Sequence, residues 1–310
     1  MRTPKEQVLL FFKGMGMGAF DIVPGVSGGT IAFITGIYEE LISSIKSVDL
    51  PAVKMLFTGD FPGFWKKING RFLLILVSGI LVSLLSLAKL ISGLMQTHPI
   101  QLWSFFFGLI LISALVVCKD VRKWRMNVTI GLIFGCLIAF FITNVAPAQT
   151  PNTIPTVFLS GAIAICAMIL PGISGSFILI ILGKYSFIIN ALTSFDLGTI
   201  LIFALGCAVG LLSFSRLISW LFKKYHDIAI AVLAGFMLGS LNKVWPWKQT
   251  IETFIDRHGE ARPLIEENVL PNTYLSMGSD PFFWQALLFF TLGVGLVVLL
   301  EKMAINLKHG

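Results

Sequence analysis

Charged residues are scarce in this sequence. Only 13% of its 310 residues are Asp, Glu, Lys or Arg, whereas 56% are hydrophobic. A soluble domain carries about 25% charged and about 45–50% apolar residues. One water-soluble core could not bury this much apolar surface, so a soluble globular fold is excluded. We predict an all-α integral membrane protein, because long apolar segments cross a bilayer as helices.

Cysteine pairs and metal-ligand spacings are also missing, and we expect no cleavable leader. The cysteines have no CxxC or Cys/His spacing, and we expect small packing residues and no metal or other cofactor. They are Cys118, Cys136, Cys166 and Cys207. Only residues 8–12 are uninterrupted before Lys13, which argues against a signal peptide. The net charge is +7, but the bases flank apolar segments, which indicates a cytoplasmic membrane face and no nucleic-acid partner.

Six apolar stretches are long enough to cross a bilayer, which takes ~20 residues. They cover residues 72–95, 100–118, 128–145, 199–222, 228–244 and 283–300. Two further apolar regions, residues 8–45 and 155–192, are each interrupted by a Pro-Gly phrase and could be re-entrant hairpins or pairs of crossings. Lys and Arg occupy alternate loops, which predicts that both termini are cytoplasmic. Residues 246–281 are then an outward loop, either a lid or a short surface helix.

The two Pro-Gly phrases belong to an internal repeat. The matching residues, all 147 positions apart, are Pro24, Gly25, Ser27, Gly28, Gly36 and Tyr38 with Pro171, Gly172, Ser174, Gly175, Gly183 and Tyr185. Further matches from Gly79/Gly206 onward are 127 positions apart. Each unit, residues 1–150 and 151–310, holds one hairpin and three crossings. Because three is odd, the second unit is inverted, which is the architecture of secondary transporters.

The phrases could bind an anion. Proline cannot continue a helix, glycine tolerates a turn, and a helix N-terminus offers free N–H groups and partial positive charge. Two such tips facing each other would suit a phosphate. The alternative is that the small residues only permit tight packing. The predicted substrate-binding residues here are Pro24, Gly25, Ser27, Gly28, Gly29, Thr30, Pro171, Gly172, Ser174, Gly175 and Ser176.

Three charged residues are candidates for transport chemistry. Lys89 and Arg216 occupy matching positions inside the first full crossing of each unit, where a cation is costly. They could hand a phosphate across the protein, or could snorkel to the interface. Asp21 has no charged equivalent, since Met168 holds the matching position. It could bind a coupling ion, a proton or sodium, or could cap backbone N–H groups.

Residues 21–30 (DIVPGVSGGT) with 36–38 (GIY), and 170–175 (LPGISG) with 183–185 (GKY), resemble the bacterial polyprenyl-phosphate translocases of the PopT type. The resemblance covers nearly the whole chain. It implies a non-enzymatic transporter in the bacterial cytoplasmic (inner) membrane. Its partner would be undecaprenyl phosphate, a polyprenyl phosphate lipid moved from the outer to the inner leaflet for cell-envelope and peptidoglycan synthesis. Oligomeric state stays open.

Two alternative functions use similar features. Undecaprenyl-diphosphate phosphatases embedded in the membrane carry an Arg after the Ser of their Pro-Gly-x-Ser phrase, where this chain has Gly28 and Gly175. They also need intramembrane glutamates, whereas Glu39 and Glu40 are adjacent and, like Lys184, are expected to be solvated near a surface. An ion-coupled carrier of a small soluble anion would use the same tips. A sealed central cavity favours that carrier, and a cleft open sideways to lipid favours the lipid translocase.

Overall fold

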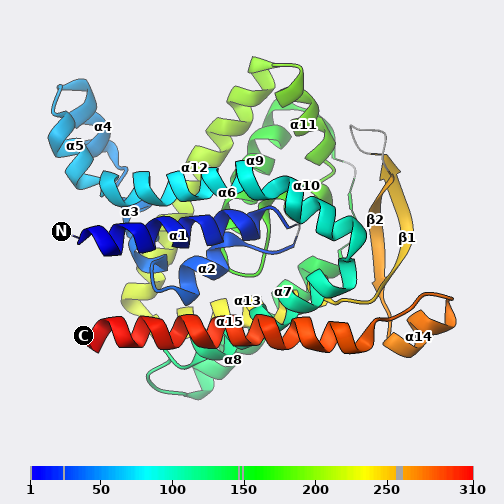
Figure 1. Ribbon diagram of the computed structural model, residues 1–310. Helices are drawn as coiled ribbons and strands as arrows, with labels where there is room; N and C mark the ends of the chain where they lie inside the picture. Colours follow the sequence, from blue (N-terminus) through cyan, green and yellow to red (C-terminus); the bar gives the residue numbers. More distant parts are fainter. Residues whose placement is uncertain (1, 24, 146, 149, 256–260, 310) are drawn as a thin grey trace.

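Helices dominate the computed structural model, which describes residues 2–309 except 24, 146, 149 and 256–260 (Figure 1). Six described helices are long and apolar enough to cross a membrane. They are α6 (Gly70–Thr97), α7 (Pro99–Cys118), α8 (Met126–Asn144), α12 (Leu197–Lys224), α13 (His226–Ser240) continued by the 3-10 helix η1 (Leu241–Val244), and α15 (Phe283–His309). These six helices coincide with the six predicted crossings.

Large apolar side chains cover the outside of these helices. Leu85 on α6 is 86% exposed, Phe141 on α8 is 70% exposed and Leu201 on α12 is 61% exposed. Contiguous apolar surface of this kind is unfavourable in water. In a bilayer it faces lipid, and the backbone polar groups are satisfied within each helix. The exterior therefore agrees with the composition.

The two interrupted regions fold into similar series of one longer helix and two short ones. Their bounds are α1 (Pro4–Asp21), α2 (Gly28–Ile34) and α3 (Tyr38–Lys46), then α9 (Ile154–Ile169), α10 (Gly175–Ile181) and α11 (Tyr185–Thr193). Gly25 and Gly172 have φ of 88° and 92°, a region in which side chains other than glycine are strained. Helices α10 and α11 meet at a bend of 112°. The Pro-Gly phrases thus break both regions at matching places.

Close helix packing follows the same pattern in both halves. Helix α1 packs along α6, α9 along α12, α7 along α15, and α8 along α13. Glycines spaced four residues apart lie against the facing helices, as small residues do where membrane helices pack closely. These pairs are Gly14/Gly18, Gly131/Gly135, Gly206/Gly210 and Gly235/Gly239. The four cysteines are free thiols, as expected.

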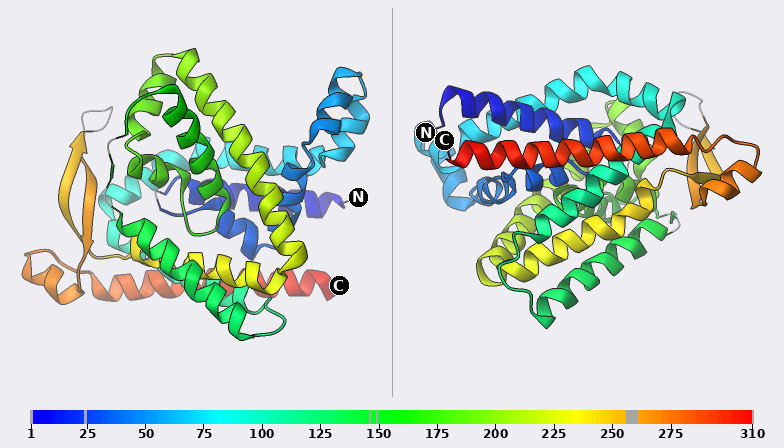
Figure 2. Two further views of the ribbon diagram at one scale, coloured as in Figure 1. Left: turned by 180° about the vertical axis from the view of Figure 1, so that it is seen from behind. Right: turned by 60° about the horizontal axis from the view of Figure 1, so that its bottom comes forward.

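Residues 246–281, the predicted outward loop, contain a β-hairpin that the sequence did not predict. Strands β1 (Lys248–Ile255) and β2 (Ala261–Asn268) form an antiparallel hairpin, and α14 (Pro271–Ser276) follows. Both termini lie at the end of the molecule opposite this hairpin, the end that also carries α4 (Leu50–Phe57) and α5 (Phe61–Lys67) (Figures 1 and 2). The Pro-Gly breaks lie between these ends. The main core includes Val23 and Val26 in the first break, together with Leu109 of α7 and Met237 of α13.

Candidate functional site

The first Pro-Gly junction is buried, and the backbone N–H groups of Gly28 and Gly29 are paired there. Ser27 caps α2, and its Oγ accepts a hydrogen bond from Gly29 N at 3.1 Å. Gly28 N donates to Asp21 Oδ1 at 2.7 Å. Ser27 and Thr30 are fully buried. Pro24 lies outside the described residues.

The two junctions touch each other at the centre of the protein. Ser27 Oγ donates to the carbonyl of Met168 at 3.1 Å, and Gly172 N donates to Thr30 Oγ1 at 3.2 Å. A Cβ on Gly29 would lie 2.6 Å from the carbonyl oxygen of Ile169, so only glycine fits this approach. The two Pro-Gly phrases are thus in direct contact with each other in the structure.

The second junction packs against α13. Pro171, Gly172, Ser174 and Gly175 are buried there, and Ser174 Oγ lies 2.8 Å from Ser176 Oγ. A Cβ on Gly172 would lie 2.8 Å from Oγ of Ser240. In this structure the two halves are closed on each other, and the donors of Gly28, Gly29 and Gly172 are bonded to protein oxygens.

Asp21 caps a backbone N–H group, which is one of the two roles predicted for it; the other is binding of a coupling ion. Its carboxylate accepts from Gly28 N and therefore satisfies a donor of the helix that follows the break. A Cβ on Gly28 would lie 2.6 Å from Asp21 Oδ2, so the carboxylate also needs glycine there. This contact gives Asp21 a structural role whether or not it binds a coupling ion.

Lys89 and Arg216 do not join the junctions in this structure. Both side chains are exposed, one on α6 and the other on α12. Within the described part of the chain, neither makes a hydrogen bond or an ion pair. Their role as substrate contacts therefore stays a prediction.

Lys184 corrects one expectation, because it is fully buried and not solvated. Its Nζ donates to the carbonyls of Thr150 and Pro151 at 2.7 and 2.6 Å, and to Asn152 Oδ1 at 2.6 Å. Three acceptors replace the water that a buried ammonium loses. Lys184 thereby ties the connection before α9 to the turn between α10 and α11.

A largely buried pair of lysines lies beside the first junction, and the sequence did not reveal it. The side chain of Lys243 in η1 packs against Gly25, where a Cβ would lie 2.7 Å from Lys243 Cγ. Its Nζ lies 4.9 Å from the ring centre of Phe177 and 3.4 Å from Glu266 Oε2. Lys248 Nζ lies 3.4 Å from the same oxygen and 4.4 Å from the ring centre of Trp103.

The electrostatics of this cluster differ from those of surface ion pairs. Burial lowers the pKa of Lys248 to about 8, and the neighbouring positive charge of Lys243 adds to this, although Glu266 opposes it. Burial alone would raise the pKa of Glu266, but the two lysines outweigh it and hold that pKa below its usual range. No local pattern in the sequence signals the cluster, because β2 brings Glu266 back from 18 positions beyond Lys248.

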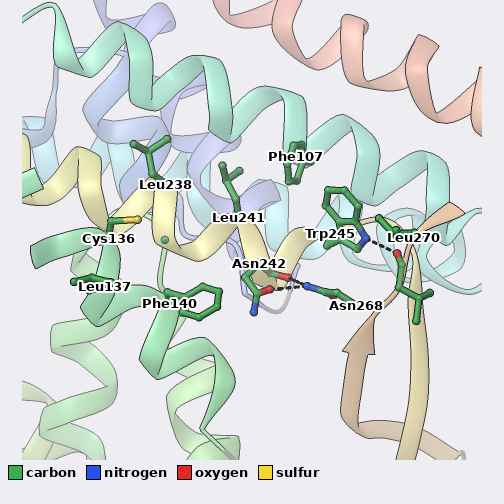
Figure 3. A pocket seen from close by; sticks show the side chains of 12 residues that line it. Phe107, Cys136, Leu137, Phe140, Leu238, Leu241, Asn242, Trp245, Asn268 and Leu270 are labelled. Carbon is green, nitrogen blue, oxygen red and sulfur yellow. Dashed lines mark hydrogen bonds between the residues drawn. The ribbon is translucent and has the colours of Figure 1, made fainter. Parts of the chain in front are cut away.

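An apolar groove of about 480 Å³ lies beside η1 (Figure 3). Its lining comes from α7, α8, α13, η1 and the strand end of β2. Two asparagines from different elements meet in this lining. The side-chain amide of Asn268 donates a hydrogen bond to Asn242 Oδ1, with an N···O distance of 2.7 Å. Leu137 and Phe140 of α8 line the groove and are 62% and 51% exposed, so it opens sideways on a candidate membrane-spanning helix.

Six apolar helices around a buried junction define a multi-pass membrane protein. Residues 17–262 match the family described as undecaprenyl phosphate translocase-like. A polyprenyl-phosphate transporter of Vibrio cholerae is 46% identical over 295 residues, 95% of this chain and 96% of that protein. A polyprenyl-phosphate transporter of Staphylococcus aureus is 31% identical over 253 residues, 76% of this chain and 84% of that protein. No solved structure shows a significant match. The chain belongs to the undecaprenyl phosphate translocase-like family.

Proposed function

We propose that this protein moves undecaprenyl phosphate from the outer to the inner leaflet of the bacterial cytoplasmic membrane, where the carrier is reloaded for envelope synthesis. Family membership and the names of the two relatives support a polyprenyl phosphate as substrate. The structural observation that carries the proposal is the apolar groove, which opens sideways through α8. A lipid can enter such a groove from the bilayer, whereas a small soluble anion has no use for it.

The physical task is modest. A charged phosphate is costly in hydrocarbon, but an isoprenoid tail is not. The protein therefore needs to shield only the head group while the tail stays in lipid. The groove has the size of a small-ligand pocket, so it holds the part of the tail nearest the phosphate.

Alternating access follows from an inverted repeat of residues 1–150 and 151–310. Three features support that repeat: equal lengths of seven residues for α2 and α10, equal lengths of 28 for α6 and α12, and matching positive φ at Gly25 and Gly172. In this mechanism the contacts of Ser27 with Met168 and of Thr30 with Gly172 separate, and the two broken regions rock past each other as re-entrant hairpins. Outward-open and inward-open states would be near mirror images.

The predicted residues take the following roles in this mechanism. Separation of the junctions would free the Ser, Thr and glycine N–H donors for the phosphate oxygens. Lys89 and Arg216 would contact the phosphate near the two membrane faces. Asp21 would couple the movement to a proton or sodium gradient. The termini would be cytoplasmic, and the β1–β2 hairpin would face outward, because these features lie at opposite ends of the molecule.

A liposome assay tests the proposal. Purified protein is placed in vesicles with undecaprenyl phosphate, and protection of the head group from a membrane-impermeant reagent is followed in time. We expect protein-dependent protection that Lys89→Ala or Arg216→Ala slows. The matched control is Lys123→Ala, which removes an exposed lysine from the loop just before α8.

Two other outcomes would overturn the proposal. Release of free phosphate from undecaprenyl diphosphate in parallel vesicles would indicate a phosphatase. Uptake of inorganic phosphate under an imposed gradient, without protection of the lipid, would indicate a carrier of soluble anions.

A further inference from the structure

Three charged side chains lie together next to the first junction and the groove. Lys243 and Lys248 share the single carboxylate of Glu266, and the exposed fractions of the three side chains are 21%, 8% and 20%. No other charged side chain in the described part of the chain is ion-paired with them. Two cations against one anion leave one positive charge uncompensated in a largely buried place. Such a site attracts a second negative charge.

A phosphate monoester has the charge that this site lacks. It carries about −1.5 to −2 at neutral pH and three strong acceptor oxygens. Lysine ammonium groups bind phosphate as point charges. The rings of Phe177 and Trp103 hold the two ammonium groups by cation–π attraction without neutralising them. If the phosphate replaced the carboxylate, two positive charges would meet about two negative ones.

The position also fits a lipid whose tail lies in the groove. Asn242 and Trp245 line the groove, and Lys243 lies between them in η1. Lys248 Nζ donates to the carbonyl of Lys243 at 2.7 Å, so both lysines are held at η1. On its other side Lys243 contacts Gly25 of the junction. Helix η1 therefore contributes both to the groove and to the cluster, and the cluster borders the junction at Gly25.

We propose that Lys243 and Lys248 bind the phosphate of the lipid on the β1–β2 side of the protein, and that the Glu266 carboxylate occupies this site until the phosphate displaces it. This inference rests on the proposed function and adds the residues that recognise the head group. Strand β2 carries Glu266, so displacement of the carboxylate would loosen the hairpin from η1. The β1–β2 hairpin is then a closure that the substrate itself opens.

Opposite effects of neutralising the acid and the bases test this inference. Full-length protein in detergent is titrated with farnesyl phosphate, a short polyprenyl monophosphate. We expect Lys243→Met and Lys248→Met to weaken binding roughly 10-fold or more each, the effect of losing one charged hydrogen bond. We expect Glu266→Gln to strengthen binding roughly 10-fold, because it removes the competing charge. Glu267→Gln, at the exposed neighbouring position, is the matched control and should leave affinity unchanged.

Further arms separate folding from binding and identify the ligand. Farnesol tests whether the phosphate is needed, and inorganic phosphate tests whether the tail is needed; we expect neither to bind as tightly as farnesyl phosphate. Lys248→Arg keeps the charge and should retain binding even where Lys248→Met unfolds.

Weaker binding by Glu266→Gln would show that its ion pairs only build the lysine site, and would overturn the displacement. Wild-type transport with unchanged affinity in all lysine variants would overturn the site but leave the proposed function standing. Absence of both binding and transport in the wild type would overturn the function itself.

Discussion

Replacement of Gly172 by alanine should destabilise the protein strongly. Gly172 has φ of 92°, and a Cβ there would lie 2.8 Å from Ser240 Oγ and 3.0 Å from Met237 Cα. A left-handed residue with a side chain costs about 1–2 kcal/mol. Forced contact with a packed backbone adds about 1–3 kcal/mol. We therefore expect Gly172→Ala to lower the free energy of unfolding by roughly 2–5 kcal/mol, measured by denaturant titration in detergent.

Two glycines in the same protein serve as matched controls. Gly36 has φ of 70° and nothing within 4 Å of its Cβ position, so Gly36→Ala reports the conformational strain alone, about 1–2 kcal/mol. Gly25 has φ of 88° but its new methyl group would meet only the flexible side chain of Lys243, so its cost should fall between the two. If Gly172→Ala costs no more than Gly36→Ala, the second junction does not press on α13 as described. Transport by the folded fraction should fall in the same order.

Three further predictions concern buried charges. Asp21→Ala leaves the N–H of Gly28 unpaired and should cost about 1–3 kcal/mol of unfolding free energy, whereas Asp21→Asn keeps an acceptor and should cost less; equal losses in denaturant titrations would contradict the capping role. Lys184→Met removes the donor of three hydrogen bonds and should cost on the order of 3 kcal/mol, while Lys123→Met at an exposed position should change little in the same thermal-unfolding assay. The pKa of Lys248 falls from 10.5 to about 8 on folding, so the unfolded chain binds more protons between these values and stability should rise with pH there, by roughly 3 kcal/mol in all; the same slope in Lys248→Met would refute that assignment. Lys243 and Glu266 are the charged groups that face Lys248 in the described structure.

Phosphate binding should show the opposite pH dependence. The Lys248 ammonium attracts the anion only while protonated, so affinity for farnesyl phosphate should fall as the pH rises through about 8. Lys248→Arg stays charged across this range and should abolish the fall. A decline of equal size in Lys248→Arg would place the titrating group elsewhere.

The chain's local chemistry determined the membrane-spanning helices and their breaks. An uninterrupted apolar run such as residues 100–118 can satisfy its backbone in lipid only as a helix, so α7 follows from composition alone. Proline and glycine at 171–172 cannot continue a helix, so the gap between α9 and α10 follows as well. The family resemblance can also be recognised from the sequence alone, because it depends on short motifs of contiguous residues.

Only the tertiary structure decided which polar groups meet. Thr30 and Gly172 lie 142 positions apart and share a hydrogen bond, although each phrase by itself suggested an open anion site. The two cations singled out by position, Lys89 and Arg216, are exposed. Lys243 lies at the end of the predicted crossing 228–244 and Lys248 follows it in the loop, and their side chains are only 21% and 8% exposed. The hydropathy of neighbouring residues is enough to predict a membrane-spanning helix. The burial of a charged side chain depends instead on which residues of a distant segment pack against it. Here β2 folds back and supplies Glu266, and that long-range contact places the two cations beside the junction.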